Sequence, residues 1–498
     1  MGNSVIYSAA IPSDVHEVAF KHLVRRDGQE DLCFGLWKPS QGERRLSALV
    51  YRIILPEKGE RSVHGNVSFS GTYVERAIKE ALKEGAGICF LHSHPYPGWQ
   101  GMSLDDKNAE RLLAPSCKGA TGFPLVGLTI GNDGAWSGRF SVKTGKRTYE
   151  FISCESVRVV GSYFCSTYHP ELSAAPRFKE ELKRTISAWG DVAQADLARI
   201  KFGVIGAGSI GSVVAESLAR MGVRSLLIMD FDSVELHNLD RLLHASIEDA
   251  KMGRAKVDVL KSALKGSATA DEPNIYSTES SIVELSGFKQ ALDCDILFSC
   301  VDRPWPRNVM NFIAFAHLIP VIDGGIRVSQ KHQGKLRHAD WRAHVVAPNH
   351  ACLECIGQYD PSFVAVEMEG HLDDPSYIES LPNGHPLKQN QNVFAFSLSN
   401  ASFLILQMLS YVLAPSGVAN IGRFTYHMHL GKLEKSYGTC NENCPYPSFV
   451  AQGDSSGFVF TGEHSKAEAE RAKRVSRKVH QNNIIKRIWD SLTGNLRS

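Results

Sequence analysis

The 498-residue sequence has little of several features that would identify its class directly. Its net charge is only +2, from 55 basic and 53 acidic residues, so overall charge gives no case for nucleic acid or a membrane surface as a partner. The N-terminus MGNSVIYSAA has no basic segment followed by an apolar one, so we expect no signal peptide. The most apolar stretch, 401–414, is too short to span a bilayer. We therefore expect a cytoplasmic protein.

The 11 cysteines are scattered, apart from two close pairs. This distribution argues against a disulfide framework and favours reduced thiols. The pairs are Cys352 with Cys355 and Cys440 with Cys444, and four thiolates in two such pairs are typical of a structural zinc site. The second pair has one residue more than C-x-x-C, and ordinary buried thiols remain the alternative.

The stretch 202–256 has the strongest pattern in the second half of the chain. It begins FGVIGAGSIGS, an apolar strand followed by Gly206, Gly208 and Gly211 and then by a helix predicted at 212–221. Such a turn lets a phosphate approach the backbone and the helix N-terminus. The next strand, predicted at 225–229, ends at Asp230, the position of a ribose-binding carboxylate. Taken alone, this motif would favour a dehydrogenase.

The polar residues that follow favour a nucleoside triphosphate instead. Arginine and lysine neutralise phosphate, and a carboxylate after a strand can hold Mg²⁺. The residues are Asp232, Asn238, Arg241, Lys256 and Asp302. Purely structural roles remain as alternatives to nucleotide binding for three of them, because Asp232 and Asn238 suit turns or caps and Lys256 suits a solvated helix face.

The pattern D-x-D-x-V-x-x-x-N-L-x-R, then G-x-x-K, then D-R, resembles the ThiF/MoeB family and the nucleotide-binding half of ubiquitin-activating enzymes over about 190–447. The resemblance implies a Rossmann-like, doubly wound sheet, a homodimer, and ATP-dependent adenylation of the C-terminal glycine of a ubiquitin-like protein. It implies that Asp230 binds ribose and that Asp302 serves Mg²⁺. The triphosphate contacts would be Asn238, Arg241 and Lys256.

A second motif follows the short apolar strand predicted at 88–91. His92 and His94 are two residues apart, so their imidazoles point to the same side, and Asp106 begins the next predicted helix. Two histidines and one carboxylate leave the fourth position of zinc free for water, as a catalytic site requires.

The run H-S-H-P, seven residues, S, two residues, D resembles the JAMM (JAB/MPN-type) metallopeptidase motif, and Ser103 occupies its serine position. The resemblance implies a mixed α/β domain that cuts peptide or isopeptide bonds after the terminal glycine of ubiquitin-like proteins. It also implies an upstream glutamate as general base, for which Glu30 is the candidate, with Asp31 and Glu43 as alternatives. Ser103 would stabilise the oxyanion.

No cysteine lies between 356 and 439, where a thioester-forming relative would carry its nucleophile. We therefore expect the chain to stop at the acyl-adenylate and pass it to another protein, such as a conjugating-enzyme-like acceptor. Cys300, or one of the cysteines of the predicted zinc site, is the alternative nucleophile. In ThiF/MoeB relatives a lead-in helix carries an arginine that reaches the partner's ATP site, and Arg177 and Arg184 are candidates, although a solvated helix face is an equal alternative.

We predict four segments: a JAMM-type domain at 1–160, a linker and lead-in helix at 161–200, a ThiF-type domain at 201–450, and a basic tail at 451–498 with an apolar stripe at 484–492. His427 and His429 repeat the H-x-H spacing, and we interpret them as strand packing. The chain is predicted to be a bifunctional enzyme of ubiquitin-like β-grasp proteins that uses zinc and ATP with Mg²⁺. Sulfur-carrier activation and a scaffold without catalysis remain alternatives.

Overall fold

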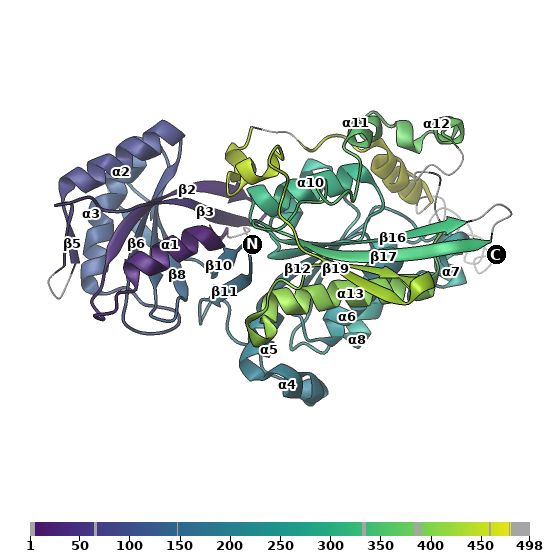
Figure 1. Ribbon diagram of the computed structural model, residues 1–498, viewed down its shortest axis with the longest axis horizontal. Coiled ribbons are helices and arrows are strands. Elements are labelled where there is room, and N and C mark those ends of the chain that lie inside the picture. The colour runs from purple at the N-terminus through teal and green to yellow at the C-terminus, as the bar shows by residue number, and fades with distance from the viewer. Residues whose placement is uncertain are drawn as a thin grey trace, which may run out of the picture.

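A computed structural model describes residues 5–63, 67–146, 148–330, 335–382, 388, 391–457, 460–477 and 479 of the chain. These residues form two large sheets, one from each half of the sequence, that lie side by side in Figure 1. The apolar stripe predicted at 484–492 lies outside the described residues.

The first sheet is mixed, with the strand order β11-β10-β1-β3-β2-β6-β7-β8-β9. Its strands are β1 Ile6–Pro12, β2 Leu32–Gln41, β3 Arg45–Ile54, β6 Gly87–Ser93, β7 Leu125–Ile130, β8 Trp136–Lys143, β9 Tyr149–Ser153, β10 Ser156–Val160 and β11 Phe164–Tyr168. The hairpin β4 Arg61–Val63 and β5 Val67–Phe69 stands apart from it. The helices in this half of the chain are α1 Ser13–Leu23, α2 Gly71–Glu84 and α3 Leu104–Thr121.

Strand β6 is buried on both faces because its side chains alternate between two cores. Cys89 and Leu91 pack in the core that α1 closes, whereas Ile88 and Phe90 pack in the core that α2 and α3 close. The strand predicted at 88–91 is present. Helices on both faces therefore fix the end of β6.

One local expectation differs from the structure. The first part of the segment predicted as a linker and lead-in helix, 161–200, contains β11, which pairs antiparallel with β10 as an edge strand. One-sided pairing tolerates the polar residues that made this segment look like a linker. Strand β2 continues to Gln41. Beyond Trp37, β2 pairs only with β3, so Pro39 fits a strand with one free edge.

The second sheet has the order β14-β13-β12-β15-β16-β17-β18-β19, parallel from β14 to β16 and antiparallel beyond. Its strands are β12 Lys201–Ile205, β13 Ser225–Met229, β14 Asn274–Thr278, β15 Ile296–Ser299, β16 Val321–Gln330, β17 Leu336–Val346, β18 Arg423–His427 and β19 Lys432–Ser436. The helices are α4 Lys183–Trp189, α5 Asp191–Arg199, α6 Ser209–Arg220, α7 Ile247–Met252, α8 Lys256–Ser267, α9 Leu285–Ala291, α10 Pro304–Ala316, α11 Ser362–Met368, α12 Pro375–Ser380 and α13 Phe394–Leu413.

Helices cover both faces of this second sheet. One core packs α6, α8 and α13 against one face, and a second core packs α9 and α10 against the other. The arrangement is a mixed α/β fold with a Rossmann-like sheet, as the glycine motif predicted. Helix α13 is long and apolar enough to cross a membrane by length and composition, and half of its most apolar window is buried inside the protein.

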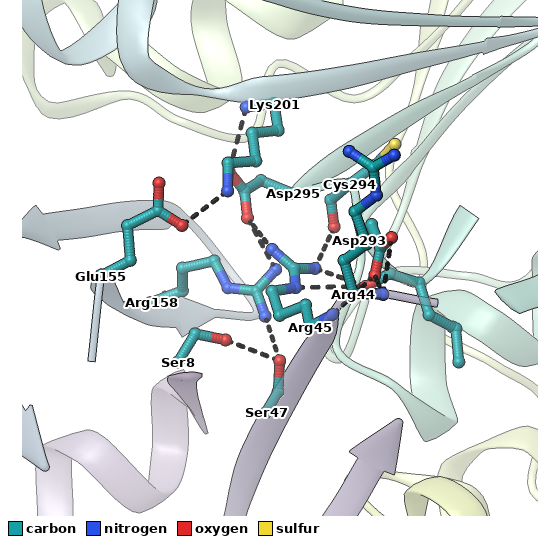
Figure 2. A network of polar contacts seen from close by, with 11 residues as sticks. Ser8, Arg44, Arg45, Ser47, Glu155, Arg158, Lys201, Asp293, Cys294 and Asp295 are labelled. Atoms are coloured by element: carbon teal, nitrogen blue, oxygen red, sulfur yellow. Dashed lines mark hydrogen bonds and ion pairs between the residues drawn. The ribbon is translucent and has the colours of Figure 1, made fainter. Parts of the chain in front are cut away.

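A buried ionic network joins the two sheets. Asp295, which precedes β15, accepts hydrogen bonds from Arg45 of β3 at 2.5 Å and from Arg158 of β10 at 3.1 Å (Figure 2). All three side chains are buried. Burial would raise the pKa of Asp295, but the two guanidinium groups hold that pKa below its usual range. Burial and the charge of Arg45 lower the pKa of Arg158 to about 9.

The apolar core continues across the same boundary. Leu49 and Val160 of the first sheet belong to one cluster with side chains of the second, such as Phe202 of β12. The hydroxyl of Tyr411 on α13 donates to Gly161 O at 2.9 Å. A shared core and a buried ion pair fix the orientation of the two halves relative to each other.

Candidate functional site

The predicted metal ligands meet at the end of β6. His92 Nε2 lies 3.2 Å from Asp106 Oδ1, and His94 Nε2 lies 3.3 Å from Asp106 Oδ2. One ligand atom from each residue lies within 4.8 Å of the others. Burial lowers the pKa of His92 to about 4, so this imidazole is neutral at neutral pH, the form that binds a metal. Two imidazoles and a carboxylate in this arrangement fit a zinc ion with one open position.

A buried chain of polar groups begins at His92 Nε2, the same nitrogen that faces Asp106, and sequence reasoning missed it. Thr129 Oγ1 lies 3.2 Å from His92 Nε2 and accepts from Arg139 Nη1 at 2.8 Å. Arg139 forms an ion pair with Glu110, whose side chain is fully buried. Glu110 stands four residues after Asp106, on the same face of α3. This spacing could have indicated from the sequence that Glu110 lies near the metal ligands.

Glu30, one of the three candidates for a general base, lies close enough to the cluster to be affected by the charges of His94 and Asp106. Burial raises the pKa of Glu30, and the charges of His94 and Asp106 act on it in opposite directions. A carboxylate beside a set of metal ligands can accept a proton from a bound water.

The other two candidates have different partners. Asp31 is buried and forms ion pairs with Arg61 and Arg25. Glu43 is exposed, and its backbone N–H donates to Lys289 O at 3.0 Å at the boundary between the two sheets. The charges of His94 and Asp106 that act on Glu30, and the separate partners of Asp31 and Glu43, therefore favour Glu30.

Ser103 forms the N-terminal cap of α3. Its Oγ accepts from the Asp106 backbone N–H at 3.1 Å, while its own N–H donates to Asp106 Oδ2 at 2.7 Å. This capping box fixes the carboxylate of Asp106 toward the histidines. In the hydrogen bond from Asp106 N–H, the Ser103 hydroxyl uses only a lone pair of its oxygen. The hydroxyl proton therefore remains available to donate to a developing oxyanion.

The glycine loop between β12 and α6 has the shape of a phosphate cradle. Gly206 has φ +97°, and a Cβ on Gly211 would lie 1.8 Å from Gly206 O, so both positions need glycine. A Cβ on Gly208 would meet no atom within 4 Å. The N-terminus of α6 is therefore open to an anion at Gly208.

Acids and one lysine surround the end of β13. Asp230 accepts from the N–H groups of Ala207 at 2.7 Å and Asp232 at 2.8 Å. Asp232 Oδ2 lies 2.7 Å from Lys256 Nζ. Burial would lower the pKa of Lys256, but Asp230, Asp232 and Asp302 raise it, so the ammonium stays charged. The solvated-lysine interpretation of Lys256 does not hold, because its side chain is only 12% exposed.

Two predicted phosphate contacts make local bonds instead. Asn238 Oδ1 accepts from Glu235 N at 3.2 Å in a capping box. Arg241 donates to His237 O at 2.6 Å and pairs with the exposed Asp240 at 2.8 Å. A triphosphate role for Arg241 requires its guanidinium to leave Asp240.

The four predicted zinc cysteines also come together. Their sulfur atoms lie within 4.8 Å of one another, and those of Cys352 and Cys444 are 3.6 Å apart. Backbone N–H groups point at the sulfurs, for example from Cys352 to Cys440 at 3.2 Å. A hydrogen bond with Cys440 lowers the pKa of Cys352 to about 5. Four sulfurs with N–H donors fit a closed structural zinc site.

Two remaining sequence features have clear surroundings. Burial raises the pKa of Cys300 well above its usual range, which makes this thiol a poor nucleophile. His427 lies on β18 and has acid partners that its sequence neighbourhood did not reveal, namely Asp340 at 2.8 Å and Glu434 at 3.4 Å.

Comparison with known proteins finds similarity to the part of the chain that forms the second sheet. Residues 181–391 match the ThiF family profile. Molybdopterin-synthase adenylyltransferase of Escherichia coli (strain K12) is 33% identical over 124 residues, 24% of this chain and 47% of that protein. Ubiquitin-like modifier-activating enzyme 5 of Oryza sativa subsp. japonica is 31% identical over 121 residues, 22% of this chain and 28% of that protein.

A solved structure, E. coli MccB with ATP, has 17% sequence identity and a TM-score of 0.41, covering 54% of this chain and 74% of that one. The chain spans less than half the length of the first curated relatives it matches. The matched segment contains the glycine loop, the acid and lysine cluster around Asp230, and Asp302. Residues 181–391 are therefore a ThiF family domain.

Proposed function

We propose that this chain is a bifunctional enzyme of ubiquitin-like proteins. Its second half adenylates the C-terminal glycine of a small β-grasp protein with ATP and Mg²⁺, and its first half hydrolyses the bond after that glycine. The observation that carries the proposal is the presence of two separate clusters on one chain, the Asp230–Lys256 cluster beside the glycine loop and the His92–His94–Asp106 cluster.

In the adenylation step the glycine carboxylate attacks the α-phosphorus of ATP, an acyl-phosphate bond forms and pyrophosphate leaves. The glycine loop and the N-terminus of α6 bind phosphate, and Lys256 and Arg241 neutralise its charge. Asp230 binds the ribose, and Asp302 would hold Mg²⁺. The printed names of the relatives, an adenylyltransferase and a modifier-activating enzyme, support this chemistry.

In the hydrolytic step, zinc bound by His92, His94 and Asp106 would supply a Lewis acid. The Glu30 carboxylate takes a proton from the attacking water and delivers it to the leaving amine. The Ser103 hydroxyl donates to the oxyanion that develops on the carbonyl. The raised pKa of Glu30 and the free proton of Ser103 support these roles.

The test of the adenylation half is ATP–pyrophosphate exchange with β-grasp proteins encoded near the gene. We expect exchange with a protein ending in glycine and none after that glycine is deleted. For the hydrolytic half, a precursor extended beyond the glycine is expected to be trimmed, and a zinc chelator should stop the trimming. A chain that does neither with its cognate protein would overturn the proposal.

Sulfur-carrier activation is the second candidate. It is favoured by the relative named molybdopterin-synthase adenylyltransferase and by the poor nucleophile at Cys300, because a sulfur-transfer pathway needs no internal thioester. A thiocarboxylate on the carrier, seen as a mass increase of the product, would distinguish it from conjugation. A scaffold without catalysis would show neither zinc dependence nor exchange.

We also propose a homodimer through the ThiF domain, with an acceptor protein that receives the adenylate. Helix α4, which projects from the body in Figure 1, carries the exposed Arg184, and Arg177 precedes it. An arginine on a projecting helix is suited to reach the ATP site of a second copy. Size measurement in solution, with and without ATP, tests this arrangement.

A further inference from the structure

A helix near the C-terminal end, residues 465–477, lies against the nucleotide site although it is outside the family-matched segment 181–391. Its buried Arg474 donates from Nη1 to Ser233 Oγ at 2.8 Å and from Nε to Glu279 Oε2 at 2.8 Å. Ser233 directly follows Asp232, so Arg474 connects the acid loop after β13 to the end of β14.

The residues around this helix anchor it firmly to the same region. The His464 ring packs edge-on against Phe231, between Asp230 and Asp232 in sequence, with ring centroids 4.9 Å apart. Gly462 N donates to Val283 O at 2.8 Å. Arg471 forms an ion pair with Glu284 at 2.5 Å. Backbone bonds, ring packing and ion pairs together make this a specific contact.

A cavity of about 400 Å³ lies between this helix and the sheet. Its walls are Val257, Asp258, Ser277, Thr278, Glu279, Arg471, Arg474 and Val475. The cavity adjoins the predicted ribose site, because Asp230 N donates to Thr278 O at 3.2 Å and Val257 follows Lys256. A nucleobase is bonded directly to the ribose, so a ribose held by Asp230 places its base within reach of this cavity.

We propose that the nucleobase of ATP occupies this cavity and that the helix at 465–477 forms its outer wall, which makes the C-terminal segment part of the nucleotide site. Val475 offers an apolar contact to a ring face, and Ser277 and Glu279 offer polar groups to the base edge. Arg474 is a positioning residue that holds the Asp230–Ser233 loop. The inference rests on the proposed adenylation function.

The experiment fills the cavity from its outer wall in the full-length protein. Val475 is 60% exposed, so Val475→Trp adds a ring at the cavity without disturbing a core. Val479, 55% exposed and one helical turn later, is not a cavity wall, so Val479→Trp is the matched control. We measure equilibrium binding of ATP and of inorganic triphosphate by calorimetry, without any protein substrate.

We expect Val475→Trp to weaken ATP binding by about tenfold or more and to leave triphosphate binding unchanged, while Val479→Trp binds both like the wild type. Arg474→Ala should also weaken ATP binding. In ATP–pyrophosphate exchange with the protein substrate, Arg474→Ala should raise the KM for ATP more than it lowers kcat, and Arg474→Lys should partly restore both. ATP binding unchanged in both Val475→Trp and Arg474→Ala overturns the inference alone. A wild-type protein that binds no ATP overturns the proposed function as well.

Discussion

The two candidate sites differ in how much of the chain builds each one. The three proposed metal ligands lie within 92–106, on one strand end and the first turn of the following helix. The nucleotide site draws on residues from Gly206 to Arg474, carried by β12, β13, the start of α8 and the C-terminal helix. The compact motif depends on one strand end and one helix start, whereas the distributed site depends on the packing of its whole domain.

The Cys352–Cys444 cluster lies in the distributed half and should give the largest effect. Cys352→Ser is expected to remove one equivalent of zinc and to lower the Tm strongly, because structural zinc is worth about 10 kcal/mol or more in small zinc domains. Elemental analysis and thermal unfolding measure both. Cys165→Ser, at an exposed cysteine, is the control. Unchanged zinc content in Cys352→Ser would refute the assignment.

Substitution of Glu30 tests the compact site, because it removes the proposed general base. Glu30→Gln removes the proton acceptor but leaves all three metal ligands, so hydrolysis should fall by about 100- to 10,000-fold with zinc content and ATP–pyrophosphate exchange unchanged. Glu43→Gln, at the exposed alternative, should hydrolyse normally. If Glu43→Gln is the inactive variant, the assignment of the base is wrong.

Asp295 tests the boundary that both halves share. Asp295→Ala leaves Arg45 and Arg158 buried without their acid, and we expect a loss of about 3–5 kcal/mol in the free energy of unfolding. Urea unfolding measures this loss. Asp271→Ala breaks the exposed pair with Lys179 and should cost less than about 1 kcal/mol. Equal effects of the two substitutions would contradict a buried network.

A smaller effect concerns acid stability. Burial lowers the pKa of His317 and of His344 to about 3, whereas a histidine in the unfolded chain titrates near 6.5. The unfolded state therefore binds more protons below pH 6.5, so this stability is present above that pH and is lost as the pH falls toward 3. The loss is about 2 kcal/mol per histidine between pH 7 and 5.

His317→Gln should make the unfolding free energy less dependent on pH by that amount, because glutamine does not titrate. His317 Nδ1 lies 2.8 Å from Ser40 Oγ, so the variant needs comparison at each pH with its own value at pH 7. The same fall between pH 7 and 5 in variant and wild type would show that His317 is not the source.

The sequence predicted what is encoded locally. The strand at 225–229 and the helix start at Asp106 both match the structure, because glycine turns and apolar periodicity act over a few residues. The two cysteine pairs were also predicted to meet, from residue chemistry and not from local structure.

Long-range features were beyond this reasoning. Nothing near Arg45 in sequence indicates that it pairs with Asp295, and Thr129 gives no local sign that it contacts His92. The helix at 465–477 looked like part of a basic tail because its charge is visible in sequence, whereas its partners Ser233 and Glu279 are about 200 residues away. Such contacts depend on tertiary packing, which residue patterns alone do not specify.

The most direct test of two separable sites is ATP–pyrophosphate exchange by wild type, Asp302→Ala and His92→Ala, using a β-grasp protein that already ends in its mature glycine. The account predicts that exchange is lost in Asp302→Ala and retained in His92→Ala. Exchange retained in Asp302→Ala, or lost equally in both variants, would contradict it.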